Sequence, residues 1–194
     1  MEFSALKTND DFIIEDLFTI TPRIISDERG FFFESWNQRK FDEIIGKRIS
    51  FCQDNHSRSN KGVLRGMHYQ LEPHSQGKLV RCTYGTIYDV AIDIRKSSKT
   101  FGKWGGVKLS HKNKKQFWIP RGFAHGFLTL SEAAEVQYKT DGYWYKDCER
   151  SLRWNDKNLN INWPNILSFE KPILTKKDKE APSFLEAQSK GDIF

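Results

Sequence analysis

Two stretches of the sequence decide the fold: Gly62-Val63-Leu64-Arg65-Gly66-Met67-His68-Tyr69-Gln70 and Pro120-Arg121-Gly122-Phe123-Ala124-His125-Gly126-Phe127. Each places a histidine among apolar neighbours that favour a strand. A polar side chain in such surroundings needs a hydrogen-bond partner or a function, because burying it unpaired is costly. His68 and His125 are therefore candidate functional residues.

Further short β-rich segments surround both stretches. Within residues 87–94, Val90, Ile92 and Ile94 fall on one face of a strand by period-two alternation. Other strands are expected in residues 12–25 (as a pair), 107–109, 117–119, 127–130 and 135–138, with turns at Gly85 and at Gly105-Gly106. Many short strands separated by glycine turns are typical of a sandwich, a jelly roll or a barrel.

Helical patterns are few. Residues 41–45 carry apolar side chains at i, i+3 and i+4 spacing, with Asn37 or Ser35 as the N-cap and Gly46 at the end. The C-terminal region is expected to form a short helix around residues 183–186, followed by loosely held residues.

The composition indicates one globular domain. No linker or repeat divides the 194 residues, and 15 Phe, 6 Trp and 6 Tyr supply a sizeable core. The N-terminus has no signal-peptide pattern, and no apolar run is long enough to cross a bilayer. Cys52, Cys82 and Cys148 are odd in number and form no CxxC pair. We therefore expect neither a disulfide framework nor a structural zinc site, and a cytoplasmic location.

The net charge of +6 raises the question of a polyanionic partner. The basic residues are mixed with 25 acidic ones and form no long basic arm, which argues against nucleic acid. A mild positive balance also suits a small polyanion such as a nucleotide diphosphate. Charge alone leaves both ligands open.

The two opening stretches resemble the two sequence motifs of the cupin jelly roll. Metal-binding cupins place His-x-His and a later Glu in the first motif, whereas here Gln70 stands two residues after His68 and no Glu follows at the expected position. A transition metal prefers several imidazole or carboxylate ligands, so His68 and His125 alone are an incomplete set. We therefore predict a mainly β, cupin jelly-roll barrel with a few short helices and without a metal.

Histidines without a metal are free for acid–base chemistry. His68 has the intrinsic pKa of a general base. Lys78 opens a strand and could stabilise an oxyanion, and the phenol of Tyr138 could return a proton. Proton removal beside a carbonyl, followed by delivery from the opposite face, inverts the carbon. The reaction class that these residues favour is epimerisation.

A larger set of separated motifs occurs in a consistent order. These are residues 27–34 (DERGFFFE), 53–57 (QDNHS), 64–70 (LRGMHYQ), 76–81 (QGKLVR), 93–95 (DIR), 119–127 (IPRGFAHGF), 138–140 (YKT), 163–164 (WP) and 174–178 (LTKKD). In these motifs the chain closely resembles the dTDP-4-dehydrorhamnose 3,5-epimerase family of the cupin superfold. The resemblance covers about residues 12–180 of a single domain 1–194 and leaves residues 181–194 as a tail.

The resemblance implies roles for individual residues. His68 matches the general base and Tyr138 the general acid, Lys78 matches the residue that stabilises the enolate, and Asp178 matches the carboxylate that orients the base. The positions that match substrate-binding residues are Arg29, Glu34, Gln53, Asn55, Arg65, His125, Tyr143, Glu149 and Lys177. Trp144 departs from the family, where a Tyr is expected beside Tyr143.

The implied activity is the cofactor-independent conversion of dTDP-4-keto-6-deoxyglucose (dTDP-4-dehydro-6-deoxy-D-glucose) into dTDP-4-dehydro-L-rhamnose by a cytoplasmic homodimer that binds neither nucleic acid nor membrane. Three alternatives stay open at the level of sequence. They are an epimerase that inverts only C3 or C5 of a related nucleotide sugar, a cupin that binds nucleotide sugars without catalysis, and a metal-dependent cupin oxygenase.

Overall fold

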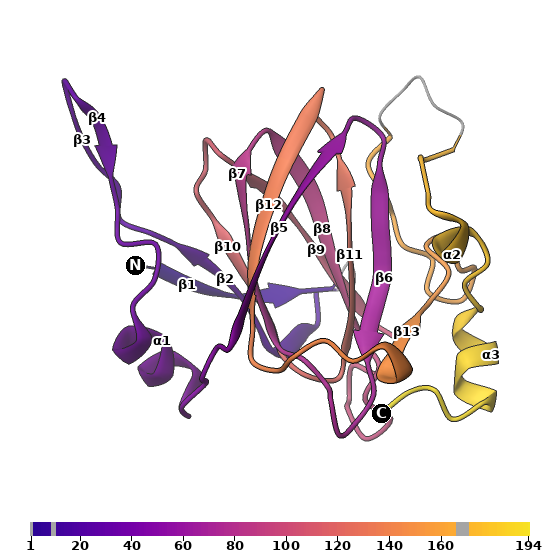
Figure 1. Cartoon of the computed structure of the whole chain (residues 1–194). Helices are drawn as coiled ribbons and strands as arrows, with labels where there is room; N and C mark the ends of the chain where they lie inside the picture. The colour runs from indigo at the N-terminus through magenta and orange to yellow at the C-terminus, as the bar shows by residue number, and fades with distance from the viewer. Residues whose placement is uncertain (1, 9–10, 166–170) are drawn as a thin grey trace.

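The computed structural model describes residues 2–8, 11–165 and 171–194. Two antiparallel sheets face each other and form a barrel-like sandwich (Figure 1). The larger sheet consists, in spatial order, of β1 (Glu2–Lys7), β2 (Ile13–Thr21), β10 (Gln116–Ile119), β7 (Lys78–Tyr84), β12 (Ala133–Thr140) and β5 (Gln53–Asn60). The smaller sheet consists of β13 (Glu149–Ser151), β6 (Leu64–Gln70), β11 (Phe123–Thr129), β8 (Thr86–Asp93) and β9 (Trp104–Ser110). The predicted mainly β jelly-roll architecture is confirmed.

Two features of the N-terminal region differ from the prediction. Residues 12–25 do not form a pair of strands, because residues 13–21 make the single strand β2. Its partner is β1, which the sequence pattern did not indicate because most of its side chains are exposed. A separate hairpin of β3 (Ile25–Asp27) and β4 (Gly30–Phe32) projects away from the barrel (Figure 1).

Apolar side chains fill both faces of the smaller sheet. Between the sheets, Val80, Phe117 and Phe127 belong to one buried cluster. On the outer face, Val90 and Ile92 pack in a second cluster with residues of the C-terminal region, as alternation predicted. Because both faces of β8 are covered, the intervening residues of this strand are buried as well.

The short helices lie outside the sheets. α1 (Gln38–Ile45) begins after Asn37, whose side chain accepts from Lys40 N, and ends at Gly46 in the left-handed conformation, as predicted. η1 (Lys146–Cys148) and α2 (Lys176–Lys179) were not predicted. α3 (Phe184–Ser189) begins with a capping box between Ser183 and Glu186, close to the expected position.

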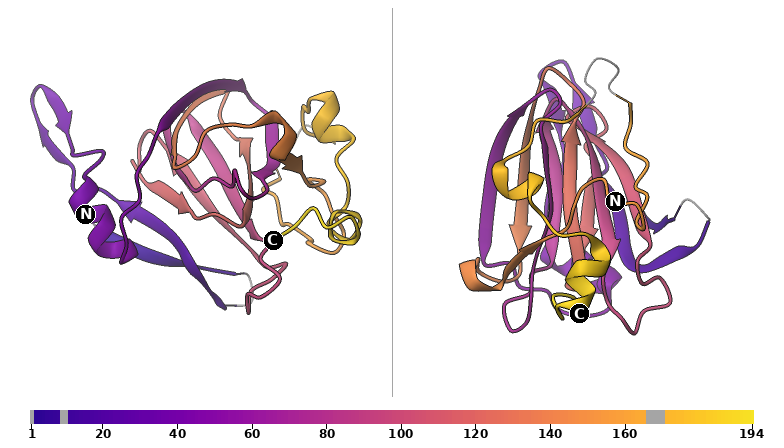
Figure 2. Two further views of the ribbon diagram at one scale, coloured as in Figure 1. Left: turned by 60° about the horizontal axis from the view of Figure 1, so that its bottom comes forward. Right: turned by 90° about the vertical axis from the view of Figure 1, so that its right-hand side faces the viewer.

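The end of the chain is held against the barrel. The prediction that residues 189–192 are loosely held was therefore wrong. Asp192 forms an ion pair with Arg150, and its carbonyl accepts from Tyr69 Oη. Phe194 N donates to the carbonyl of Ile94. Figure 2 shows the C-terminal helices lying over the smaller sheet, where they bury its outer face.

Two facing glycines let β6 and β11 approach closely. A Cβ on Gly126 would lie 2.6 Å from Met67 Sδ and 2.8 Å from the carbonyl oxygen of Arg65. A Cβ on Gly66 would lie 2.5 Å from Gly126 Cα. All three distances are far below ordinary van der Waals contact, so side chains are excluded here. The same pairing makes His68 and His125 direct cross-strand partners.

We predict that Gly126→Ala destabilises the fold by about 2 kcal/mol, because the added methyl group overpacks the β6–β11 contact. Urea unfolding measures the change. Gly191→Ala is the control, since the space around Gly191 is open and only its positive φ penalises alanine, by about 1 kcal/mol. An equal or smaller loss in Gly126→Ala than in the control would contradict the account.

Candidate active site

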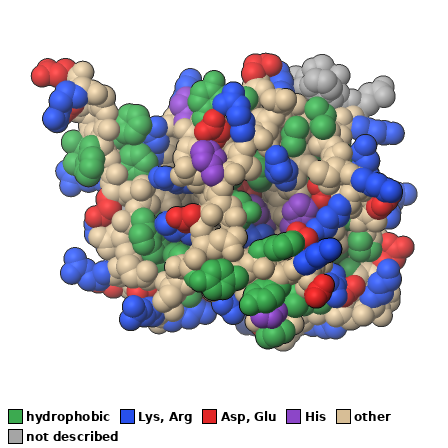
Figure 3. Space-filling model, in the orientation of Figure 1, with side chains coloured by type: hydrophobic (Ala, Val, Ile, Leu, Met, Phe, Trp, Pro, Cys, Tyr) green, Lys and Arg blue, Asp and Glu red, His purple; other side chains and the backbone are tan. Residues whose placement is uncertain are grey.

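A cavity of about 480 Å³ opens between the two sheets. Both sheets contribute to its walls, and α2 closes one side. Its lining includes Gln53, Asn55, Arg65, His68, Lys78, His125, Tyr138, Trp144, Glu149, Lys177 and Asp178. Figure 3 shows histidine side chains recessed among their neighbours on this side of the molecule.

His68 and Asp178 form a hydrogen-bonded dyad in the cavity. His68 Nε2 lies 2.6 Å from Asp178 Oδ1, although the two residues are 110 positions apart. Thr175 caps α2 by accepting from Asp178 N, which fixes the carboxylate. Burial acts to raise the pKa of Asp178, but the hydrogen bond and charge of His68 outweigh it and lower that pKa. The ionised carboxylate accepts a hydrogen bond from Nε2 of His68, which leaves Nδ1 of the ring for proton transfer.

Lys78 is a buried amine at the start of β7. Its Nζ donates to the carbonyl oxygen of His68 at 3.2 Å. Burial lowers the pKa of Lys78 to about 8, against the opposing negative charges of Asp89 and Glu149. At neutral pH the amine is therefore an ammonium group in a buried site, where its charge acts strongly.

Tyr138 reaches the cavity from β12 in the larger sheet. Burial raises the pKa of its phenol, so the hydroxyl keeps its proton at neutral pH. His68 stands on β6 in the smaller sheet. The imidazole and the phenol thus approach the cavity from opposite sheets.

A second imidazole–carboxylate pair lies deeper in the wall. His125 Nε2 is 2.6 Å from Asp89 Oδ1, and both side chains are buried. Burial lowers the pKa of His125 despite the neighbouring carboxylate, which favours a neutral ring.

Polar residues surround the rim of the cavity. Arg65 Nε donates to Ser59 Oγ at 2.9 Å, and Gln53 donates to Asn55 Oδ1 at 3.0 Å. Glu149 and Lys177 form an ion pair of 2.6 Å that joins β13 to α2 across the rim. These groups could bind the phosphates and hydroxyls of a polar ligand.

Three of the expected substrate-binding residues do not line the cavity of the single chain described here. Arg29 stands on the projecting β3–β4 hairpin and pairs with Asp27. Glu34 pairs with Lys40 of α1.

Tyr143 is the third such residue. It is 60% exposed, and the neighbouring Trp144 lines the cavity instead. The motif match identified residue types and order but not the direction in which each segment leaves the barrel.

Two polar residues were missed as parts of the site. Gln70 is buried; its amide donates to the carbonyls of His74 and Tyr143 and accepts from Tyr145 N, so it holds the loop that presents Trp144. Asp89 was passed over within the predicted strand 87–94. An acidic residue between apolar neighbours in a strand was the available signal.

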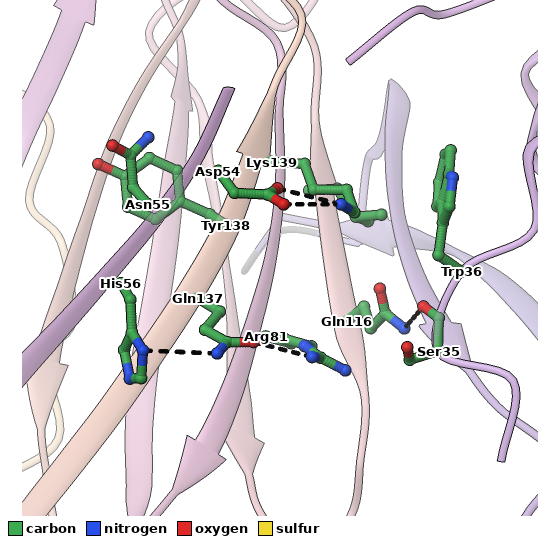
Figure 4. Close-up of a pocket in the computed structure, with 11 residues that line it drawn as sticks. Ser35, Trp36, Asp54, Asn55, His56, Arg81, Gln116, Gln137, Tyr138 and Lys139 are labelled. Atoms are coloured by element: carbon green, nitrogen blue, oxygen red, sulfur yellow. Dashed lines mark hydrogen bonds and ion pairs between the residues drawn. The ribbon is translucent and has the colours of Figure 1, made fainter. Parts of the chain in front are cut away.

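A second pocket, of about 290 Å³, lies on the outer side of the larger sheet (Figure 4). Its polar groups are paired with one another: Lys139 with Asp54, and Arg81 with Gln137. It shares Tyr138 with the cavity but lacks the dyad and Lys78. Proton-transfer groups are therefore concentrated in the cavity between the sheets.

Within the described residues, no group of three or more His, Cys, Asp or Glu side chains is placed to hold a metal ion. None of the helices in this part of the chain is long and apolar enough to cross a membrane.

The jelly roll and its metal-type histidines, paired here with carboxylates, define a cupin with an acid–base site. The family model for dTDP-4-dehydrorhamnose 3,5-epimerase matches residues 11–186. The dTDP-4-dehydrorhamnose 3,5-epimerase of Shigella flexneri is 55% identical over 90% of this chain and 94% of its own length. The chain belongs to the dTDP-4-dehydrorhamnose 3,5-epimerase family.

Solved structures agree with this assignment. The dTDP-6-deoxy-D-glucose-3,5-epimerase of Legionella pneumophila, in complex with dTDP-4-keto-L-rhamnose, has a TM-score of 0.88 at 45% identity and covers 99% of this chain and 97% of its own. A 3'-monoepimerase from Streptomyces bikiniensis, in complex with dTDP-quinovose, has a TM-score of 0.86 at 30% identity, covering 93% and 89%. The fold is therefore shared by enzymes of both stereochemical outcomes.

We predict that Lys78→Met stabilises the protein at pH 7 by on the order of 2 kcal/mol, because it removes a buried charge. Lys78 binds its proton more tightly in the unfolded chain than in the folded one. Burying its charge therefore lowers the stability of the wild-type protein by the full amount below pH 8. This loss of stability fades between about pH 8 and 10.5, so the stabilisation by Lys78→Met becomes smaller over the same range. Urea midpoints at pH 7 and pH 10 measure this. Lys139, which is ion-paired and only partly buried, provides the control variant Lys139→Met, and an equal gain there would contradict the prediction.

Proposed function

We propose that this chain is a dTDP-4-dehydrorhamnose 3,5-epimerase that converts dTDP-4-dehydro-6-deoxy-D-glucose into dTDP-4-dehydro-L-rhamnose. The observation that carries the proposal is the single cavity that holds the His68–Asp178 dyad, Lys78 and Tyr138. A base, a cation and a proton donor are the three groups that epimerisation beside a ketone requires. Family membership and the relatives at 53–55% identity support the same reaction.

In this mechanism, His68 Nδ1 removes the proton from the carbon next to the C4 ketone. The C–H electron pair forms the enolate, and the negative charge moves to the C4 oxygen. Asp178 stabilises the imidazolium that results and keeps the ring oriented. The position of Asp178 on α2 leaves Nδ1 free for this step.

The enolate is stabilised by the Lys78 ammonium, whose charge is most effective in a buried site. Tyr138 then donates its phenolic proton to the same carbon from the larger sheet. Since His68 acts from the smaller sheet, the two protons pass through opposite faces of the sugar ring. Exchange with solvent returns both groups to their starting protonation states, and the same apparatus serves C3 and C5.

The rim supplies binding groups for the nucleotide. Arg65 and Lys177 carry positive charges that suit the negative diphosphate. Gln53 and Asn55 can form hydrogen bonds with polar groups of the substrate, and the ring of Trp144 can stack on the base. When a diphosphate arrives, Lys177 would exchange Glu149 for a phosphate oxygen. We further propose a cytoplasmic setting, which the three free cysteines suit.

We also propose that the enzyme is a homodimer. The β3–β4 hairpin exposes Ile25, Phe31 and Phe32, an apolar surface that favours a partner. Its edge and the outer pocket of the larger sheet offer a surface for a second copy. In such a dimer, Arg29 could reach the partner's cavity, which would account for its match to a substrate-binding position.

We predict that the wild-type protein, incubated with dTDP-4-keto-6-deoxyglucose in deuterated water, places deuterium at both C3 and C5. His68→Ala should lower this exchange by about 10³-fold while dTDP binding is retained, because the base is lost but the rim is not. Mass spectrometry and NMR read the label carbon by carbon. His111→Ala, remote from the cavity, is the matched control and should exchange normally.

The same measurement separates the alternatives. Label at only one carbon would replace the proposal with a mono-epimerase, and binding without any exchange would indicate a binding protein. Inhibition by a chelator would favour a metal-dependent enzyme. Retained exchange in His68→Ala would overturn the assignment of the base.

We predict that Phe32→Glu shifts the protein from dimer to monomer, because it places a charge in the proposed apolar contact. Analytical ultracentrifugation measures the change. The exposed Leu185, on the C-terminal helix far from the hairpin in sequence, provides the control Leu185→Glu. A wild-type monomer, or equal dissociation in both variants, would contradict the proposed interface.

A further inference from the structure

Asp89 is a fully buried carboxylate on the inner face of β8, the face that also carries Ile87 and Ala91 of the cluster between the sheets. Its Oδ1 is 2.6 Å from Nε2 of His125. Its second oxygen, Oδ2, is buried without a hydrogen-bond partner in the described part of the chain. His125 pairs with His68 across the β6–β11 pair, so Asp89 contacts the neighbour of the proposed base and not the base itself.

This arrangement is costly unless something compensates it. A buried carboxylate with an unsatisfied oxygen destabilises a fold, and an apolar residue would fit the surroundings better. Another acid on the same strand, Asp93, shows the fully satisfied alternative: it accepts from Arg95, Ser98 and Thr100. Among the described residues Asp89 has one hydrogen-bond partner, His125, and its negative charge is therefore only partly compensated there.

The compensating charge is on Lys78. This lysine lines the same cavity, and among the residues that the structure describes its Nζ has one hydrogen bond, to a neutral carbonyl. Asp89 is the first of the two negative groups that favour the charged form of Lys78, ahead of Glu149. The buried carboxylate and the buried ammonium therefore stabilise each other by charge alone, with no ion pair between them in the described part of the chain.

We propose that Asp89 is a positioning residue of the epimerase, which holds His125 with its proton on Nε2 and keeps Lys78 cationic for the enolate. The inference rests on the proposed function. With Nε2 directed to Asp89, Nδ1 of His125 is left as an acceptor for a sugar hydroxyl. Asp89 itself never touches the substrate, since it is absent from the cavity lining.

The effect of Asp89 on Lys78 appears in the pH dependence of the reaction. The titratable groups that surround Lys78 are Asp89 on β8, His68 on β6, His125 on β11, Tyr138 on β12 and Glu149 on β13. Among these, the phenol of Tyr138 has a raised pKa, so it loses its proton only at higher pH. The alkaline limb of kcat/KM in the free enzyme should therefore report Lys78, near pH 8.

The test is the pH profile of Asp89→Asn, measured as deuterium exchange on the full-length protein. Asparagine keeps the size and one acceptor but removes the charge. We expect kcat to fall about tenfold or more and the alkaline limb to move down by at least one pH unit, because Lys78 loses its proton more easily. Asp93→Asn is the matched control on the same strand, and its alkaline limb should coincide with that of the wild type.

The outcomes distinguish this inference from the proposed function. Wild-type protein without exchange overturns the function, and this inference with it. An active wild type combined with an unmoved alkaline limb in Asp89→Asn overturns the inference alone, even if the variant is less stable. An equal shift in Asp93→Asn also overturns it, because the effect would then be a general response to disturbing β8.

A second measurement needs no variant and covers the case in which Asp89→Asn fails to fold. Imidazole ¹⁵N NMR of the wild-type protein reports the protonation of each ring nitrogen. We expect His125 to be neutral at pH 7 with its proton on Nε2. A ring protonated on Nδ1 alone, or a doubly protonated ring, would overturn the proposal.

Discussion

The pairing of β6 with β11 is the constraint on which the site depends. Two glycines let the strands lie closer than side chains would permit, and this register sets His68 opposite His125. Each imidazole then meets a carboxylate from a different element, Asp178 from α2 and Asp89 from β8. The backbone of a rigid sheet, rather than a flexible loop, therefore fixes the spacing of the reacting groups.

Charge burial follows from that constraint. Closing two sheets over the cavity buries Lys78, Asp89 and Asp178, and a buried charge is costly unless an opposite charge or a hydrogen bond compensates it. The interior contains charges of both signs, and each reduces the cost of the others. The fold thus accepts lower stability in exchange for strong electrostatics at the place where an enolate would form.

Sequence reasoning located the centre of the site better than its edges. His68 could be found because it breaks the apolar pattern of a strand. Lys78 and Tyr138 could be found because the motifs place them at the start of one strand and within another. Arg29 could not be placed in the same way, because the residues around it carry no sequence pattern that predicts a hairpin projecting from the barrel. β1 was missed because an edge strand with exposed side chains has no alternation to detect.

The base and its carboxylate are separated by 110 positions, and α2 lies among the last twenty residues of the chain. During synthesis, the strands of both sheets are complete before α2 leaves the ribosome. A nascent barrel can therefore enclose its histidines and lysine while the proton relay is still unfinished. Docking of the C-terminal segment then brings Asp178 to His68 and completes the active site of a barrel that has already folded.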